Sequence, residues 1–335
     1  MCRSARRDWA LCALIACGFL AALPAQAQTA TPPASDAPQA APVLPGFVDE
    51  AVRLGEDRSE RMTLPVEVAG LGPYPFIIDT GSQRSIVATE LAERLALPLL
   101  APVTIVSMAG REQVASVHLP QIKFGSYVVK DLPALSIAHA NLGSAGLIGL
   151  DGLKDKRLTL DFRAGKMEVG RSRRTQRESS DGQTIIVEAR SRFGQLILVG
   201  SKIDGRKVSV VLDTGAELSI GNMALLRKLK LQKLVIPPTA ATLTSVTGET
   251  VPVLFSIVRQ INIESVMLEN VPMVFLDAAP FDELKLADHP SMLLGMKMLR
   301  MFDRVAIDFG NRQIDLHLPR GDNTPRADKS ALAGL

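Results

Sequence analysis

FIIDTGSQRSIV, residues 76–87, contains the tripeptide DTG at 79–81, and the second half of the chain repeats it at 213–215 within VVLDTGAELSIG, residues 210–221. In each copy an apolar run ends in an acid, and the glycine that follows permits a sharp turn. Burying an unpaired carboxylate is costly. Two acids at equivalent strand ends therefore indicate that their side chains meet.

The alternative for either copy is an ordinary aspartate in a strand-end turn that accepts hydrogen bonds from nearby backbone. The second copy argues against it, because the similarity extends beyond the tripeptide. A serine follows each glycine at the same spacing, Ser85 and Ser219, and an isoleucine comes next, Ile86 and Ile220. The sequence therefore predicts a duplicated structural unit.

The length of 335 residues and the hydrophobic fraction of 47% allow two domains of ordinary size. The expected segments are a signal peptide (1–27), an Ala/Pro-rich disordered spacer (28–58), an N-terminal lobe (59–170), a basic linker (171–183), a C-terminal lobe (184–320) and a flexible tail (321–335).

The first 27 residues have the pattern of a secretory signal. Three arginines precede an apolar run at 9–23, and a small-x-small cleavage pattern ends before Gln28. The run is too short for a good membrane anchor. We expect a periplasmic or secreted protein without a transmembrane anchor. Lipoprotein anchoring through Cys17 is an alternative, which the apolar residues after Cys17 disfavour.

All three cysteines, Cys2, Cys12 and Cys17, lie in the predicted signal, so the mature chain has no thiol chemistry and no disulfide. The formal net charge of +3 gives no electrostatic case for nucleic acid. We expect no cofactor and no metal site. The four histidines lack metal-ligand spacing: His118, His139, His289 and His317.

Local patterns predict short strands and hairpins that occur in the same order in both halves. The first half has an expected turn at 70–75 before the first DTG, and a helix at 88–97 capped by Thr89. Its hairpins are expected to turn at 109–110, near Gly125 and at 164–165. The second half repeats this series, and its first hairpin turns at 247–248.

Two DTG strand ends, each followed by a hairpin and later by an apolar-apolar-Gly segment (147–149 and 293–295), resemble the aspartic proteases of the pepsin and retropepsin clan. The resemblance covers residues 60–318. It implies an all-β, bilobal acid-protease fold with short helices and a cleft between two homologous lobes. The small lobes are most similar to a tandem, two-lobe bacterial retropepsin-like exported protease.

The resemblance implies that Asp79 and Asp213 are the catalytic residues. Two close carboxylates hold one proton between them, so one can activate a water while the other polarises a peptide carbonyl. The residues expected to support the catalytic loops are Thr80, Gly81, Ser82, Thr214, Gly215 and Ala216. The residues expected to form flaps over the substrate are Met108, Ala109, Gly110, Val246, Thr247 and Gly248.

We therefore expect an exported aspartic endopeptidase that acts on a polypeptide bound in extended form, as a monomer with lobes paired within the chain. Alternatives are a non-catalytic periplasmic peptide-binding or sensor protein on the same fold, and pairing of lobes between chains. The halves differ at Ser82 and Ala216, and at Asp151 and Lys297, which follow the two apolar-apolar-Gly segments.

Overall fold

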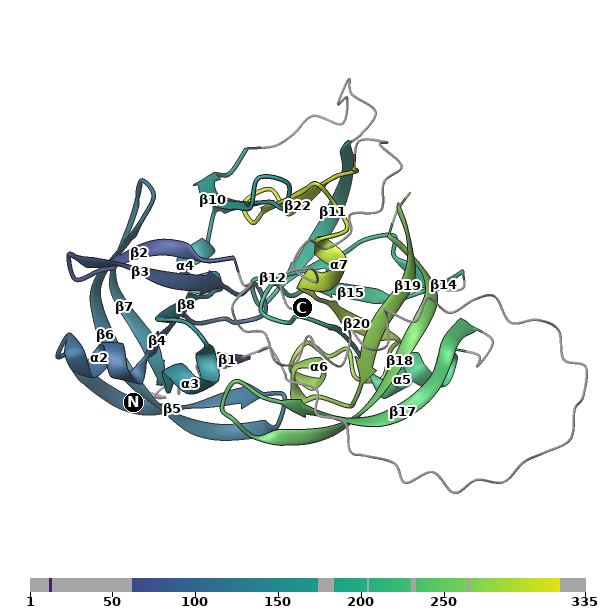
Figure 1. Cartoon of the computed structure of the whole chain (residues 1–335), viewed down its shortest axis with the longest axis horizontal. Coiled ribbons are helices and arrows are strands. Elements are labelled where there is room, and N and C mark those ends of the chain that lie inside the picture. Colours follow the sequence, from purple (N-terminus) through teal and green to yellow (C-terminus); the bar gives the residue numbers. More distant parts are fainter. Residues whose placement is uncertain are drawn as a thin grey trace, which may run out of the picture.

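The computed structural model describes residues 12–13, 62–173, 184–203, 205–229, 233–263 and 266–319. Within these residues most of the chain is β strand, the helices are short, and the strands belong to two sheets (Figure 1). The predicted fold class is confirmed. None of the described helices has the length and apolar composition needed to cross a membrane.

The first half forms the smaller sheet. Its described strands are β2 (Leu64–Val68), β3 (Leu71–Ile78), β4 (Ile86–Ala88), β5 (Leu99–Ser107), β6 (Gly110–Phe124), β7 (Tyr127–Ile137) and β8 (Gly146–Ile148). Strand β6 pairs with both β2 and β7, so the path β6-β2-β3-β8-β4-β7 closes on itself as in a barrel. The helices of this half are α2 (Thr89–Arg94), α3 (His139–Leu142) and α4 (Leu150–Leu153).

One further two-residue strand, β1 (Cys12–Ala13), falls within the predicted signal peptide and pairs in parallel with β5. Apart from these two residues, the predicted signal and spacer lie outside the described residues, as do most of the predicted linker and the tail.

The second half repeats the strand order. Its described strands are β12 (Gln195–Leu198), β13 (Lys202–Ile203), β14 (Arg206–Lys207), β15 (Ser209–Leu212), β16 (Ser219–Gly221), β17 (Leu234–Thr244), β18 (Thr250–Ile263), β19 (Val266–Phe275) and β20 (Ser291–Leu294). The accompanying helices are α5 (Met223–Lys228), α6 (Ala279–Glu283) and α7 (Met296–Leu299). In both halves a long hairpin, β5–β6 or β17–β18, follows the DTG loop.

A set of strands from both halves joins them. These strands are β9 (Lys156–Asp161), β10 (Lys166–Arg171), β11 (Thr184–Arg192), β21 (Arg304–Asp308) and β22 (Gln313–His317). Strand β9, which precedes the predicted linker, pairs with β21 near the end of the chain, with Arg157 opposite Asp308. The two halves therefore share one sheet.

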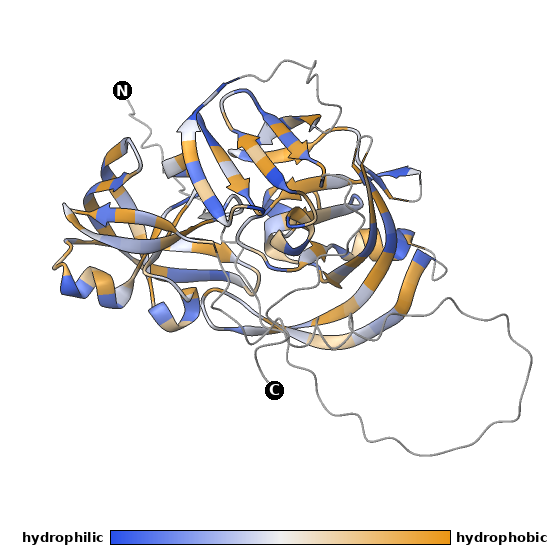
Figure 2. Cartoon of the chain, turned by 45° about the horizontal axis from the view of Figure 1, so that its top comes forward, coloured by the Kyte–Doolittle hydropathy of each residue, from blue (hydrophilic) through white to orange (hydrophobic). Residues whose placement is uncertain are grey.

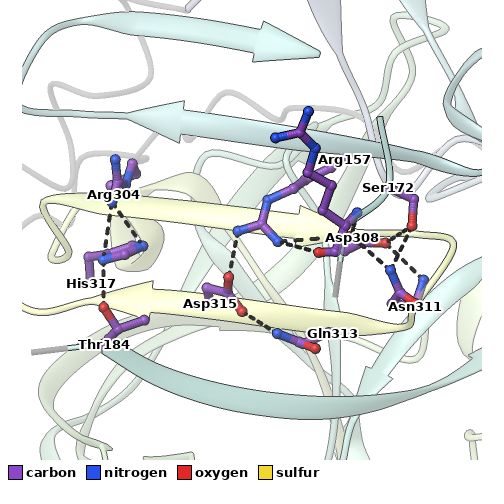
Figure 3. A network of polar contacts seen from close by, with 10 residues as sticks. Arg157, Ser172, Thr184, Arg304, Asp308, Asn311, Gln313, Asp315 and His317 are labelled. Carbon is purple, nitrogen blue, oxygen red and sulfur yellow. Dashed lines mark hydrogen bonds and ion pairs between the residues drawn. The ribbon is translucent and has the colours of Figure 1, made fainter. Parts of the chain in front are cut away.

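Polar contacts hold this shared sheet together (Figure 3). The guanidinium of Arg157 on β9 donates to Asp315 on β22 and lies 3.9 Å from Asp308 on β21. Asp308 also accepts hydrogen bonds from the hydroxyl of Ser172 and the backbone N–H of Arg173. The chain just before residue 174 is thus fixed to the second half.

The strands form because apolar residues alternate with polar ones, as the colours in Figure 2 show along many of them. In β2, for example, Leu64, Val66 and Val68 are buried, whereas Pro65 is exposed and Glu67 is half-buried. The alternation directs one face of each strand to the core.

Two local predictions were wrong. The turn expected at 70–75 consists of Ala69 and Gly70 alone, with φ of 51° and 79°. A two-residue loop with positive φ at both positions matches the twist of paired strands, so β3 can begin at once. Helix α2 is shorter than expected and is not capped by Thr89, whose hydroxyl lies 3.0 Å from that of Ser136 on β7. The hairpins expected at 109–110, 164–165 and 247–248 are present.

Candidate active site

Each DTG loop begins where a buried strand leaves its partner. Strand β3 runs parallel to β8, and the backbone N–H of Asp79 continues the ladder by donating to Ile148 O at 3.0 Å. In the second half β15 runs parallel to β20, and Asp213 N–H donates to Leu294 O at 3.1 Å. Both side chains are fully buried.

The loop backbone then folds around each carboxylate. Oδ1 of Asp79 accepts from the N–H groups of Gly81 at 2.7 Å and Ser82 at 3.1 Å. Oδ1 of Asp213 accepts from Gly215 N–H at 2.9 Å and from the N–H of the next residue, Ala216, at 3.1 Å. Such bonds favour the charged form of a carboxyl group.

The two loops are cross-linked by their threonines. Thr80 N–H donates to Oγ1 of Thr214, and Thr214 N–H donates to Oγ1 of Thr80, both at 3.1 Å. Each hydroxyl donates onward to a strand carbonyl of the opposite half, Leu212 O at 2.9 Å or Ile78 O at 2.8 Å. This reciprocal set fixes the distance between the loops.

The carboxyl groups lie in direct proximity. A Cβ added to Gly215 would be 2.3 Å from Cγ of Asp79, so only glycine lets the second loop approach so closely. Burial raises the pKa of Asp213 well above its ordinary value of 3.8, and the carboxyl of Asp79 raises it further. This environment favours retention of a proton by the pair, which titrates as a unit.

A second glycine in each half supports the loop from behind. A Cβ on Gly149 would lie 2.6 Å from the carbonyl of Arg84, and one on Gly295 would lie 2.6 Å from that of Leu218. The N–H of Gly149 donates to Ser85 Oγ at 3.2 Å. Gly295 N–H donates to Oγ of Ser219, the equivalent serine, at the same distance.

Comparison with known proteins agrees with this geometry. The chain matches the aspartyl protease family over residues 64–151 and 199–298, which together are more than half of it. The chain belongs to the aspartyl protease family. The resemblance expected from the doubled motif is confirmed.

Among solved structures, the chain is similar to a retropepsin-like aspartic protease from Rickettsia conorii. The sequence identity is 23%, the match covers 40% of this chain and 90% of that chain, and the TM-score is 0.28. No curated protein matches the chain.

The hairpin residues expected to act as flaps lie at the tips of β5–β6 and β17–β18, where each tip contacts the opposite half (Figure 1). Met108 is 4% exposed and belongs to an apolar cluster whose other buried members are all in the second half. The next strand contributes Arg111, which forms an ion pair with Glu283 on α6.

The second hairpin makes the matching contact. A Cβ on Gly248 would lie 3.1 Å from the side-chain amide of Asn141 on α3, and Val246 beside it is buried. The remaining tip residues are held by local bonds, Ala109 N–H to Ser107 Oγ and Thr247 N–H to Ser245 Oγ. Both tips are therefore docked on a short helix of the other half.

Sequence reasoning missed Gln195 at the start of β12. Its side chain is fully buried, and Nε2 donates to the carbonyl of Gly81 in the first loop at 2.6 Å. The available signal was a single polar residue opening the apolar run QLILV. Nothing in that run indicates that its partner lies in the other half.

Among the described residues no group of three His, Cys, Asp or Glu side chains could hold a metal ion. The histidine His118 lies 3.4 Å from Asp131, and His317 is 2.8 Å from the hydroxyl of Thr184. A pocket bounded by Gly215 of the second loop also reaches the apolar side chains of β9 and β10 in the shared sheet.

Proposed function

We propose that this chain is an exported aspartic endopeptidase that hydrolyses peptide bonds with Asp79, Asp213 and an activated water. One observation carries the proposal: two fully buried aspartates from equivalent loops lie against each other, and cross-linked threonines fix their spacing. Buried, adjacent carboxyl groups are costly unless they share a proton, and that state suits general acid–base chemistry.

In the proposed reaction the charged carboxylate takes a proton from water as its oxygen attacks the substrate carbonyl carbon. The neutral carboxyl group donates its proton to the carbonyl oxygen, giving a tetrahedral diol. When the C–N bond breaks, a proton passes to the departing amine and another returns from the diol to the pair. One carboxylate and one carboxylic acid are restored.

The substrate is proposed to be a polypeptide in extended form. The tips of β5–β6 and β17–β18 contact α6 and α3 of the opposite halves, and the proposal is that both hairpins lift to admit a chain to the buried aspartates. Hairpin strands can then add backbone hydrogen bonds to an extended peptide. The sharing of one sheet by the two halves supports a monomer in which the lobes pair within one chain.

Export is proposed from the sequence. The arginines, the apolar run and the small-x-small pattern of residues 1–27 are typical of a cleaved secretory signal, so the expected location is the periplasm or the exterior. Fractionation of cells that express the full chain, with N-terminal sequencing of the product, tests this. A product that still begins at residue 1 in the cytosol would refute it.

The activity is tested by digesting a denatured proteome with purified protein across a pH series, with Asp79→Asn as the matched control. Cleavage that disappears in the control and is blocked by pepstatin is expected. Cleavage that is equal in both proteins would rule out the proposed dyad. The peptide termini also report which side chains the cleft prefers.

A second candidate is a peptide sensor without turnover, and one observation favours it: each hairpin tip has one apolar residue buried, Met108 or Val246, and contacts the opposite half. The same digest distinguishes the two. Absence of cleavage at every pH, together with retention of peptides on the immobilised protein, would support the sensor.

A further inference from the structure

Gln195 lies where the second half meets the first DTG loop. It begins β12 and pairs with Arg192 across the tight turn from β11. The turn itself is seated on the first half, because a Cβ on Gly194 would lie 3.2 Å from Leu150. The backbone that carries Gln195 is therefore fixed on both sides.

The side chain of Gln195 makes one hydrogen bond that matters for the pair of aspartates. Its Nε2 donates to Gly81 O at 2.6 Å, while its Oε1 is buried without a hydrogen-bond partner among the described residues. An amide in this position costs free energy to bury unless its bonds are good ones. The bond to Gly81 is thus the interaction that a substitution would remove.

That bond acts on the carboxylate through a single peptide group. The carbonyl of Gly81 and the N–H of Ser82 belong to the same peptide unit, and Ser82 N–H donates to Oδ1 of Asp79 at 3.1 Å. A donor on the carbonyl polarises the unit and strengthens its N–H as a donor, by about 10–30% per bond in chains of this kind. A series of hydrogen bonds therefore connects Gln195 to Asp79 through the peptide group between Gly81 and Ser82.

We propose that Gln195 is a positioning residue that, through the Gly81–Ser82 peptide, places the negative charge of the pair on Asp79. The inference rests on the proposed function, because it assigns roles within the same dyad. Asp79 then acts as the base toward water, and Asp213 carries the proton that is donated to the substrate carbonyl.

The electrostatics of the surroundings leave this assignment to the hydrogen bonds of the loops. Burial raises the pKa of Asp213 and Asp79 raises it further, with no charge from another side chain among the causes. The ionisable groups on the loops and beside them include Arg84, Asp151, Glu217, Lys297 and Arg300, and Arg192 lies opposite Gln195 on β11. Glu217 is paired with Arg300, and Asp151 accepts hydrogen bonds from Ser85.

The test replaces Gln195 by Met, which keeps its length without a donor, and by Asn, which is polar but too short to reach Gly81. Leu198→Met, a buried change in the same strand, is the control for altered packing. In the full mature protein, aspartate carboxyl carbons labelled with ¹³C are titrated by NMR. The signals of the pair are identified by their loss in Asp79→Asn and Asp213→Asn, which separates them from Asp151.

Both Gln195 variants are expected to raise the lower pKa of the pair by about 0.3–0.5 pH unit, because the singly charged state loses support. The upper pKa is expected to stay unchanged, since Asp79 is charged on both sides of that step. The acid limb of kcat/KM should move equally. Leu198→Met should move neither.

A lower pKa that stays constant in both Gln195 variants would overturn the inference, even if their activity falls. The NMR titration also separates this inference from the proposed function. If the pKa moves but no protein cleaves peptide, the dyad proposal fails and the positioning role stands.

Discussion

The two halves support their DTG loops with the same backbone bonds and with different side chains. The residue after each supporting glycine, Gly149 or Gly295, bonds back to the DTG loop. Leu150 N–H donates to Ser82 O at 2.9 Å, and Met296 N–H donates to Ala216 O at 2.8 Å. In the first half the carboxylate of Asp151 accepts from the N–H and the hydroxyl of Ser85, at 2.9 and 2.7 Å.

In the second half Lys297 stands at the position equivalent to Asp151, and a carboxylate is supplied from the loop itself. Glu217 forms an ion pair with Arg300, which follows α7. The loop backbone therefore does not need one particular supporting residue. Backbone pairing sets the loop geometry, and each half stabilises it with its own charge arrangement.

The largest expected effect is the loss of activity when either catalytic aspartate is replaced, and it should be similar in the two halves. Asp79→Asn and Asp213→Asn should each lower kcat by about 10⁴-fold or more, because removing one member of a cooperating catalytic set abolishes most of its effect. Single-turnover assays on a peptide found in the proteome digest measure this. If one variant keeps most of its activity, the dyad is not the catalytic unit.

Equal behaviour is also expected of the two supporting glycines. Gly149→Ala and Gly295→Ala each place a methyl group 2.6 Å from a backbone carbonyl, so each should lower the free energy of unfolding by about 3 kcal/mol. Denaturant unfolding is the measurement. Gly170→Ala, at an ordinary backbone φ with its added Cβ 3.9 Å from the nearest atom, Arg157 O, is the control for replacement of glycine without a clash. A much smaller loss of unfolding free energy in Gly295→Ala than in Gly149→Ala would show that the backbone of the second loop can shift to accommodate the methyl group.

The free energy of unfolding should depend on pH in a way that reveals the contribution of the dyad. Burial and Asp79 raise the folded-state pKa of Asp213, so above the ordinary value of 3.8 the folded protein retains a proton that the unfolded chain has lost. Over that window stability falls as pH rises, by about 1.4 kcal/mol for each unit of pKa difference. Compared with Asp213→Asn, the wild-type protein should lose stability between pH 3.8 and the raised pKa. Parallel stability curves would contradict this.

The smallest effect is expected at the hairpin tips. Arg111→Ala removes the ion pair with Glu283, which is partly exposed and worth about 0.2–1 kcal/mol, so opening of the β5–β6 hairpin should increase by up to about fivefold. Hydrogen exchange at residues 107–110 measures it, and salt should reduce the difference. Asn141→Ala, at the contact of the second hairpin, should leave the first hairpin unchanged. Faster exchange at both tips would show that they open together.

Local patterns in the sequence predicted much of the fold. Hairpin turns and strand alternation depend on neighbouring residues, and these predictions were confirmed around Gly110, Gly165 and Gly248. The turn before β3 was misplaced because Ala69 with positive φ is uncommon, and no composition signal marks it. The cap expected at Thr89 failed because a partner on another strand, Ser136, competes for its hydroxyl.

Contacts between distant segments could not be predicted in this way. The pairing of β9 with β21, the docking of Met108 in the second half and the bond from Gln195 to Gly81 join residues more than 100 positions apart. None of these residues carries a local pattern that identifies its partner. They are fixed only when the whole chain is folded.

The sequence by itself determined that two equivalent acid-bearing strand ends exist and that each is followed by the same series of hairpins. Those features follow from side-chain periodicity and turn chemistry, which act over a few residues. Only the tertiary structure decided how close the two carboxyl groups lie, which backbone groups bond to each of them and where the hairpin tips dock. Such properties depend on burial and on hydrogen bonds between distant segments, and both arise only when the two halves pack together.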